Sequence, residues 1–133
     1  MANMTIGSVV ARGNKSRMRS VAFTHTAAAT AAGSATTTFP ITGRLLKYTT
    51  TGGDAAWTFI LNDGTVNVFS SASITAAAST AILKMHATVP HVGIAMAGQY
   101  LTCTTANVST TGLTTVPVIT IFWEESAECA ATL

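Results

Sequence analysis

The sequence predicts an all-β fold: a single antiparallel β-sandwich, jelly-roll-like, with about eight short strands and an extended N-terminal arm. Thr and Ala supply roughly a third of the residues, far above ordinary usage, whereas Lys and Glu, the usual exposed helix formers, are scarce. Thr is β-branched and suits a pleated surface. Short apolar runs also recur between Gly, Pro, Asn and Ser at near-regular spacing, which is typical of sandwiches and jelly rolls.

The N-terminal segment is expected to stand outside the sandwich. Residues 1–16 show no sustained periodicity and are rich in Gly, Asn and charge, which favours an extended arm. Residues 17–26 alternate, with Val21 and Phe23 on one face. This alternation predicts the first strand.

Two elements follow the first strand. Residues 26–38 are a low-complexity Ala/Thr/Ser/Gly stretch in which Thr and Gly dilute the Ala clusters below a credible helix. We therefore expect a loop there, and a short strand ending at Phe39-Pro40. Residues 43–51 (GRLLKYTTT) then predict a strand that Gly52-Gly53 closes.

A β-hairpin is predicted over residues 57–69. The runs WTFIL and TVNVF are both rich in β-branched and aromatic residues, and Asp63-Gly64 lies between them. Asp-Gly in this setting is the strongest short-range hairpin signal, because Gly accepts the positive φ that the turn demands.

Three further strands are expected in the second half of the chain. Residues 82–89 alternate until Pro90, which cannot donate to a β-ladder. Gly98 is expected to open a strand over residues 99–105, and residues 116–123 (VPVITIFW) form the last strand.

The last strand is apolar on both faces, so a single buried sheet face does not explain it. Its two faces are Val118, Thr120 and Phe122 against Ile119, Ile121 and Trp123. We expect one face in the core and the other against a second subunit or the arm. Val118, Phe122 and Trp123 are therefore candidate partner-binding residues.

The composition indicates one domain that is buried in an assembly. Residues 17–124 form the predicted sandwich, between the arm (1–16) and a short, acidic, flexible tail (125–133). Only 9% of the residues are charged, against about 25% in an ordinary soluble domain. No apolar run reaches the about 18 residues of a membrane helix. So few charged residues are unusual for a monomer in water, which favours burial of the chain against copies of itself or a partner.

The charges are unevenly placed along the chain. The N-terminal region holds four of the seven basic residues, namely Arg12, Lys15, Arg17 and Arg19. Three of the five acids, Glu124, Glu125 and Glu128, lie near the other end. A basic arm of this kind docks on nucleic acid or on an acidic protein surface. Because no aromatic residues are interleaved with the four cations, we favour protein docking over nucleic acid; a merely solubilising N-terminus is the remaining alternative.

The sequence offers little for catalysis, metal or cofactor binding. Asp54 and Asp63 sit beside Gly in predicted turns and are best explained as Asx-type turn formers. The three histidines have no metal-ligand spacing, and no phosphate loop or nucleophile elbow occurs. Cys103 shares strand parity with Leu101 and is expected in the core. The two tryptophans are expected in the core or in an interface. We therefore expect that the protein is not an enzyme and that it has neither a cofactor nor a metal site.

Residues 43–53, 57–69 and 97–123 carry a resemblance to a known class of protein. Their Thr/Ala-rich short strands, turn spacing and final apolar strand resemble the β-sandwich decoration (cement) proteins on the capsids of tailed bacteriophages. The resemblance implies a homotrimer, or another symmetric cluster, on the outer capsid surface that stabilises contacts between major capsid subunits. It also implies an N-terminal arm that pins the protein to the shell. Because residues 1–17 lack a charged segment followed by a long apolar core, we expect synthesis in the host cytoplasm.

Two alternatives remain open. The chain suits another phage structural component, such as a tail-tube, head-completion or tail-tip protein. A carbohydrate-binding β-sandwich would instead need an exposed aromatic row, to which Tyr48, Trp57 and Tyr100 could contribute.

Overall fold

The computed structural model describes residues 4–11, 17–26, 32–53, 56–71, 73–74, 79–82, 94–108 and 115–125. Every regular element in these ranges is a β-strand, so the all-β prediction is confirmed. The strands are β1 (Met4–Ile6), β2 (Val10–Ala11), β3 (Met18–His25), β4 (Gly33–Thr36), β5 (Ile41–Thr51), β6 (Thr58–Asn62), β7 (Asn67–Ser70), β8 (Ser79–Ile82), β9 (Ile94–Gln99), β10 (Thr102–Ala106) and β11 (Val118–Glu125).

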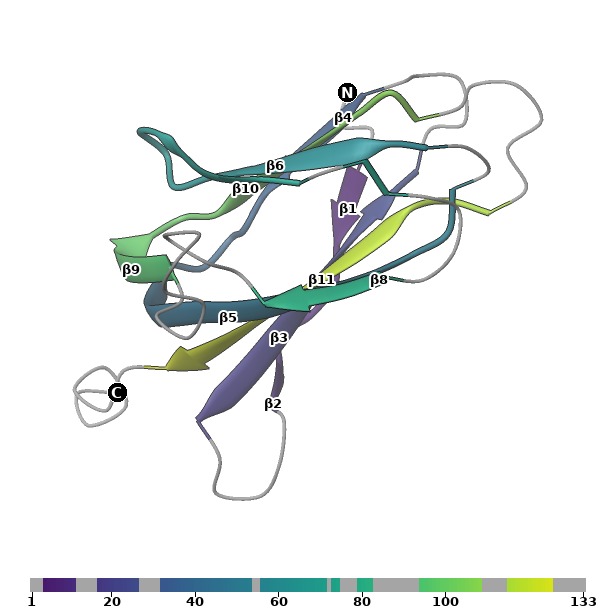
Figure 1. Cartoon of the computed structure of the whole chain (residues 1–133). Coiled ribbons are helices and arrows are strands. Elements are labelled where there is room, and N and C mark those ends of the chain that lie inside the picture. Colours follow the sequence, from purple (N-terminus) through teal and green to yellow (C-terminus); the bar gives the residue numbers. More distant parts are fainter. Residues whose placement is uncertain are drawn as a thin grey trace.

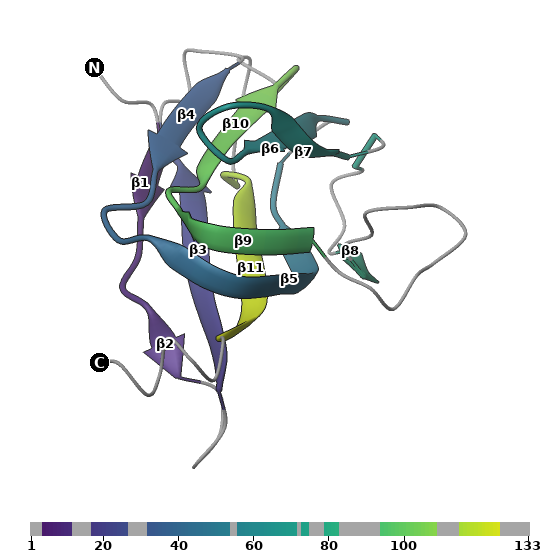
Figure 2. The ribbon, with the colours of Figure 1, turned by 90° about the vertical axis from the view of Figure 1, so that its left-hand side faces the viewer.

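The strands form two antiparallel sheets that pack as a sandwich (Figures 1 and 2). The large sheet has the order β1-β3-β11-β5-β8, with β2 also paired to β3 and β9 also paired to β5. The small sheet has the order β4-β10-β6-β7. The face of the large sheet that points away from the small sheet is called the outer face below.

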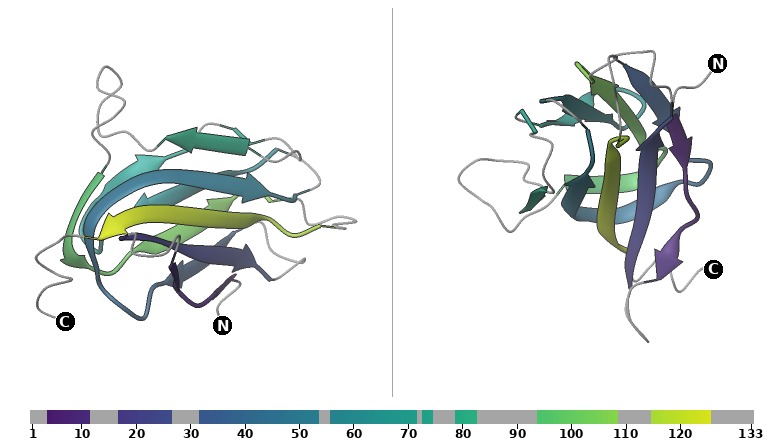
Figure 3. Two further views of the ribbon diagram at one scale, coloured as in Figure 1. Left: turned by 90° about the horizontal axis from the view of Figure 1, so that it is seen from below. Right: turned by 90° about the vertical axis from the view of Figure 1, so that its right-hand side faces the viewer.

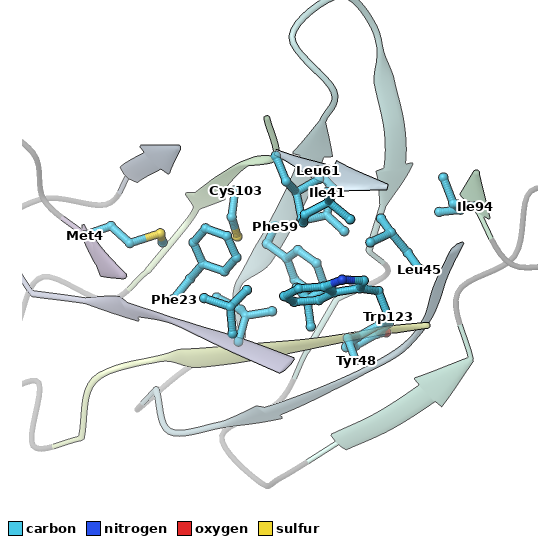
Figure 4. Packing of buried hydrophobic residues seen from close by; sticks show 14 of the residues in the cluster. Met4, Phe23, Ile41, Leu45, Tyr48, Phe59, Leu61, Ile94, Cys103 and Trp123 are labelled. Carbon is cyan, nitrogen blue, oxygen red and sulfur yellow. The ribbon is translucent and has the colours of Figure 1, made fainter. Parts of the chain in front are cut away.

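The core lies between the two sheets, and both contribute large side chains (Figure 4). Phe23 and Ile121 from the large sheet and Phe59 and Leu61 from the small sheet are all fully buried. Burying one such side chain stabilises the fold by about 1.5–3 kcal/mol. Cys103 lies in the same cluster, as its strand parity predicts.

Strand β5 pairs with both β9 and β8, and this pairing explains why one prediction from the sequence is wrong. Its first half pairs with β9 and its second half with β8, both antiparallel. The residues Ala97 and Gln99 pair with Thr42 and Ile41, which leaves Gly98 unpaired at a bulge with φ 79°. Gly98 therefore does not open a strand: it lies within β9, which the sequence analysis had not predicted.

The hairpin prediction is confirmed. Strands β6 and β7 pair antiparallel around a loop that starts at Asp63, and Gly64 has φ 98°. The Asp63 carboxylate accepts hydrogen bonds from the backbone N–H groups of Thr65 and Val66, both at 2.9 Å. Asp63 is thus an Asx-type turn former, as expected.

The N-terminal segment is not a free arm where the structure describes it. Residues of β1 and β2 pair with β3, with Met4 opposite His25 and Val10 opposite Ser20. The Met4 side chain is buried in the core. The expectation that the arm stands outside the sandwich is wrong for residues 4–11, because the edge of β3 needs backbone partners and Met4 adds apolar burial.

Candidate partner-binding surface

Strand β11 is two-faced, as its sequence predicts. Ile119 and Ile121 are fully buried against the small sheet, whereas Val118, Thr120 and Phe122 lie on the outer face and are partly exposed. The left panel of Figure 3 shows β11 flanked by β3 and β5, so the outward-facing side chains of β11 lie in the middle of the outer face.

Two cross-strand rows extend this face onto the neighbouring strands. Across β3, β11 and β5 the rows are Thr24, Val118 and Thr51, and then Ala22, Thr120 and Thr49. All six side chains are uncharged, and four of them carry a hydroxyl group. The result is a wettable and charge-free band in the middle of the outer face.

Phe122 lies in the next row and borders the first charge. It pairs with Ser20 of β3 and with Lys47 of β5. The Lys47 ammonium lies 4.7 Å from the centroid of the Phe122 ring, which is a cation–π contact. At an exposed site such a contact contributes about 0.5–1 kcal/mol. Lys47 thus covers part of the ring, while Phe122 stays partly exposed.

Trp123 does not belong to this surface. Its side chain is only 2% exposed and lies on the core side of β11, where its ring stacks on Phe39 with centroids 6.0 Å apart. Because neighbours along a strand point to opposite faces, Trp123 cannot share a contact with Phe122. We therefore remove Trp123 from the candidate partner-binding residues.

Two of the arginines within the described ranges lie beside acids of the same chain. Arg19 Nη2 is 3.4 Å from Glu125 Oε2, and Arg44 Nη2 is 3.2 Å from Glu124 Oε1. Each pair is partly exposed and contributes about 0–1 kcal/mol. Arg19 therefore has an intramolecular partner and is not simply available for docking. Glu125, the first residue of the predicted tail, belongs to β11 together with Glu124.

These ion pairs border a hollow of about 340 Å³ where β11 ends and β5 begins. Its lining includes Arg17, Thr42, Arg44, Met96, Glu124 and Glu125. Arg17 is exposed, and its backbone carbonyl accepts a hydrogen bond from Glu125 N at 3.0 Å. The predicted docking residues Arg12 and Lys15, and the acidic residue Glu128, lie outside the described ranges, so their roles stay predictions.

Two described residues whose side chains could serve catalysis, His25 and Cys103, are both fully buried. His25 is fully buried, with its ring beside Thr105 of the small sheet. Burial raises the pKa of the Cys103 thiol far above its ordinary value, because the thiolate would be desolvated. Among the described residues no group of three His, Cys, Asp or Glu is placed to hold a metal ion. Asp54, His86, His91 and Cys129 lie outside those ranges.

The aromatic residues do not form a surface row. Trp57 is 1% exposed and Tyr48 is 7% exposed, so both belong to the core. Tyr100 is 48% exposed and lies between β9 and β10. Of the three aromatic residues considered for sugar stacking, one is on the surface.

The hollow is also lined by Thr42, Arg44 and Met96, which were not predicted from the sequence as site residues. Their neighbourhood depends on β9, whose alternation of Ile94 and Met96 with alanines was a usable but weak period-2 signal. The pairing of Arg44 with Glu124 joins residues far apart in sequence, and no local pattern indicates it.

Compared with protein-family models, with curated proteins and with solved structures, the chain matches none. The described part of the chain contains no helix long and apolar enough to cross a lipid bilayer.

Proposed function

We propose that this protein is a non-catalytic structural component of a virion: a decoration (cement) protein that binds the outer capsid surface and stabilises contacts between major capsid subunits. It acts as a homotrimer, and its partners are its own copies and the major capsid protein. It needs no cofactor, and it neither enters a membrane nor binds nucleic acid.

The observation that carries this proposal is the charge-free band on the outer face. Interface cores are depleted in charged residues, and the outer face around Val118 and Thr120, next to Phe122, has that composition. Within the described ranges the ion-paired arginines and glutamates lie beyond this band, at one end of the large sheet. An uncharged centre with charges beside it fits a surface that is covered in an assembly.

The choice of a capsid surface rests on the resemblance of residues 43–123 to decoration proteins of tailed phages. A tail-tube, head-completion or tail-tip protein would use the same band in the same way. A carbohydrate-binding role has less support, because Trp57 and Tyr48 are core residues and leave Tyr100 without an aromatic neighbour from that set.

Sedimentation-velocity centrifugation at micromolar concentration tests the assembly. We expect the wild-type chain to sediment as a trimer and Phe122→Glu to sediment as a monomer, because a buried carboxylate at the contact is costly. Phe122→Thr is a milder companion that suits a strand. Val66→Glu is the matched control: Val66 is 55% exposed on the β6–β7 loop, away from the outer face. A monomeric wild type, or a trimeric Phe122→Glu, would contradict the proposal.

The location is tested by immunogold labelling of particles from cells that produce the protein. We expect label on the outside of intact shells. Label confined to tails would favour the tail alternatives, and particles without label would reject a virion role.

A further inference from the structure

The hollow at the end of β11 has an unbalanced set of charges. Glu124 is paired with Arg44, and Glu125 is paired with Arg19. Arg17 and Arg44 line the hollow together with both glutamates, and Arg19 reaches Glu125 from outside this lining. Counting Arg19, three guanidinium groups lie at or beside two carboxylates. Both carboxylates are already neutralised, and one positive charge is left over.

The left-over charge is that of Arg17. Among the described residues, no ion pair or side-chain hydrogen bond joins its guanidinium to another group. The residue is exposed and its backbone is held by the Glu125 N–H group. A planar guanidinium with five N–H donors, fixed at its base and open at its tip, is suited to bind a carboxylate.

Two further donors face the same hollow. Arg44 uses Nη2 for Glu124 and keeps other N–H groups. The Thr42 hydroxyl has no hydrogen bond within the described part of the chain, and Thr42 is only partly exposed. An anion in the hollow would thus accept hydrogen bonds from Arg17, beside the start of β3, and from Thr42 and Arg44 near the start of β5.

We propose that this hollow binds one carboxylate, carried by an Asp or Glu side chain of a protein partner. With Arg19 counted beside the lining, the excess of one positive charge matches a single carboxylate, whereas a phosphate, with about −1.5 to −2 charges, would exceed it. The choice of a protein as the source rests on the proposed function: Arg44 and Glu124 lie on the same outer face as Phe122, so a partner seated on the band reaches the hollow.

Chemical-shift titration of the ¹⁵N-labelled protein tests this site. The probe is the capped pentapeptide Gly-Gly-Glu-Gly-Gly, and the Glu→Gln peptide is its control. We expect saturable shifts at Gly43, Ala97 and the Arg17 side-chain N–H with the Glu peptide, and none with the Gln peptide. Added salt should weaken the binding, because the site is exposed.

Two matched variants sharpen the result. Arg17→Gln and Lys47→Gln each remove one positive charge, but Lys47 lies over Phe122 and not in the hollow. We expect Arg17→Gln to weaken binding about twofold to fivefold, the range for an exposed ion pair, and Lys47→Gln to leave it unchanged. Equal losses in both variants, no saturable shift, or tighter binding of inorganic phosphate than of the Glu peptide would overturn the proposal. The titration measures peptide binding at the hollow, whereas sedimentation measures self-assembly. A failure of this proposal is therefore distinguishable from a failure of the proposed function.

Discussion

The imidazole Nδ1 of His25 lies 3.1 Å from the hydroxyl Oγ1 of Thr105, and this contact joins the large sheet to the small sheet. Both residues are fully buried. The same hydroxyl accepts a hydrogen bond from the backbone N–H of Gly33 at 2.9 Å, so it links β3, β10 and β4. A single threonine thus satisfies polar groups in both layers of an otherwise apolar core.

We expect Thr105→Val to destabilise the fold by about 1–3 kcal/mol, because the Gly33 N–H and the His25 ring lose a buried partner while the side chain keeps its shape. Thr104→Val is the matched control on the same strand: its hydroxyl bonds Ser34 on the exposed face at 3.1 Å. Urea unfolding measures both. Equal losses in the two variants would show that the inter-sheet contact is not important for stability.

Two glycines with positive φ should respond differently to alanine. Gly64 has φ 98° and open space around an added Cβ, so Gly64→Ala should cost about 1–2 kcal/mol from backbone strain alone. Gly52 has φ 85°, and an added Cβ would lie 2.0 Å from the carbonyl oxygen of Val116, so Gly52→Ala should cost more. Thermal unfolding of both variants checks the order, and a reversed order would contradict the backbone approach at Gly52.

The loop at Asp63 should be sensitive to acid. Hydrogen bonds from the backbone N–H groups of Val66 and Thr65 hold the pKa of the Asp63 carboxyl below its ordinary value of 3.8. Since the folded pKa is depressed, the stabilisation is present above pH 3.8 and is lost as the pH falls through the folded pKa. The amide shifts of Thr65 and Val66, followed by NMR, should titrate below pH 3.8 in the wild type and stay flat in Asp63→Asn. A midpoint above 3.8 would contradict these hydrogen bonds.

The Cys103 thiol should be inert in the folded protein. It is fully buried, and desolvation raises its pKa, so almost no thiolate is available for alkylation. Peptide mapping after iodoacetamide treatment should show Cys103 modified in urea and unmodified in buffer. Rapid modification in buffer would mean that the core around Cys103 opens readily.

The elements that were predictable from the sequence have local signals. Asp63-Gly64 marks its own turn, because the required φ and the side-chain cap belong to adjacent residues. The two faces of β11 follow from strand alternation, which placed Val118 and Phe122 opposite Ile119 and Ile121.

What was not predictable depends on pairing between distant segments. Residues 4–11 have no strong strand pattern of their own, and they are strands because β3 offers an edge to them. Gly98 has the appearance of a strand boundary, yet its positive φ serves a bulge that only the register with β5 creates. The Arg19–Glu125 contact joins opposite ends of the chain, so the sequence suggested docking groups where the fold makes an ion pair.

Hydroxyl-radical footprinting across a concentration series tests the central claim, that the outer face of the large sheet is buried in the assembly. Phe122 on that face and the exposed Tyr100 both react with the radical, and Tyr100 serves as the internal reference. We expect oxidation of Phe122 to fall as the chain assembles, while oxidation of Tyr100 stays constant. An assembled protein in which Phe122 reacts as fast as in the dilute monomer would contradict it.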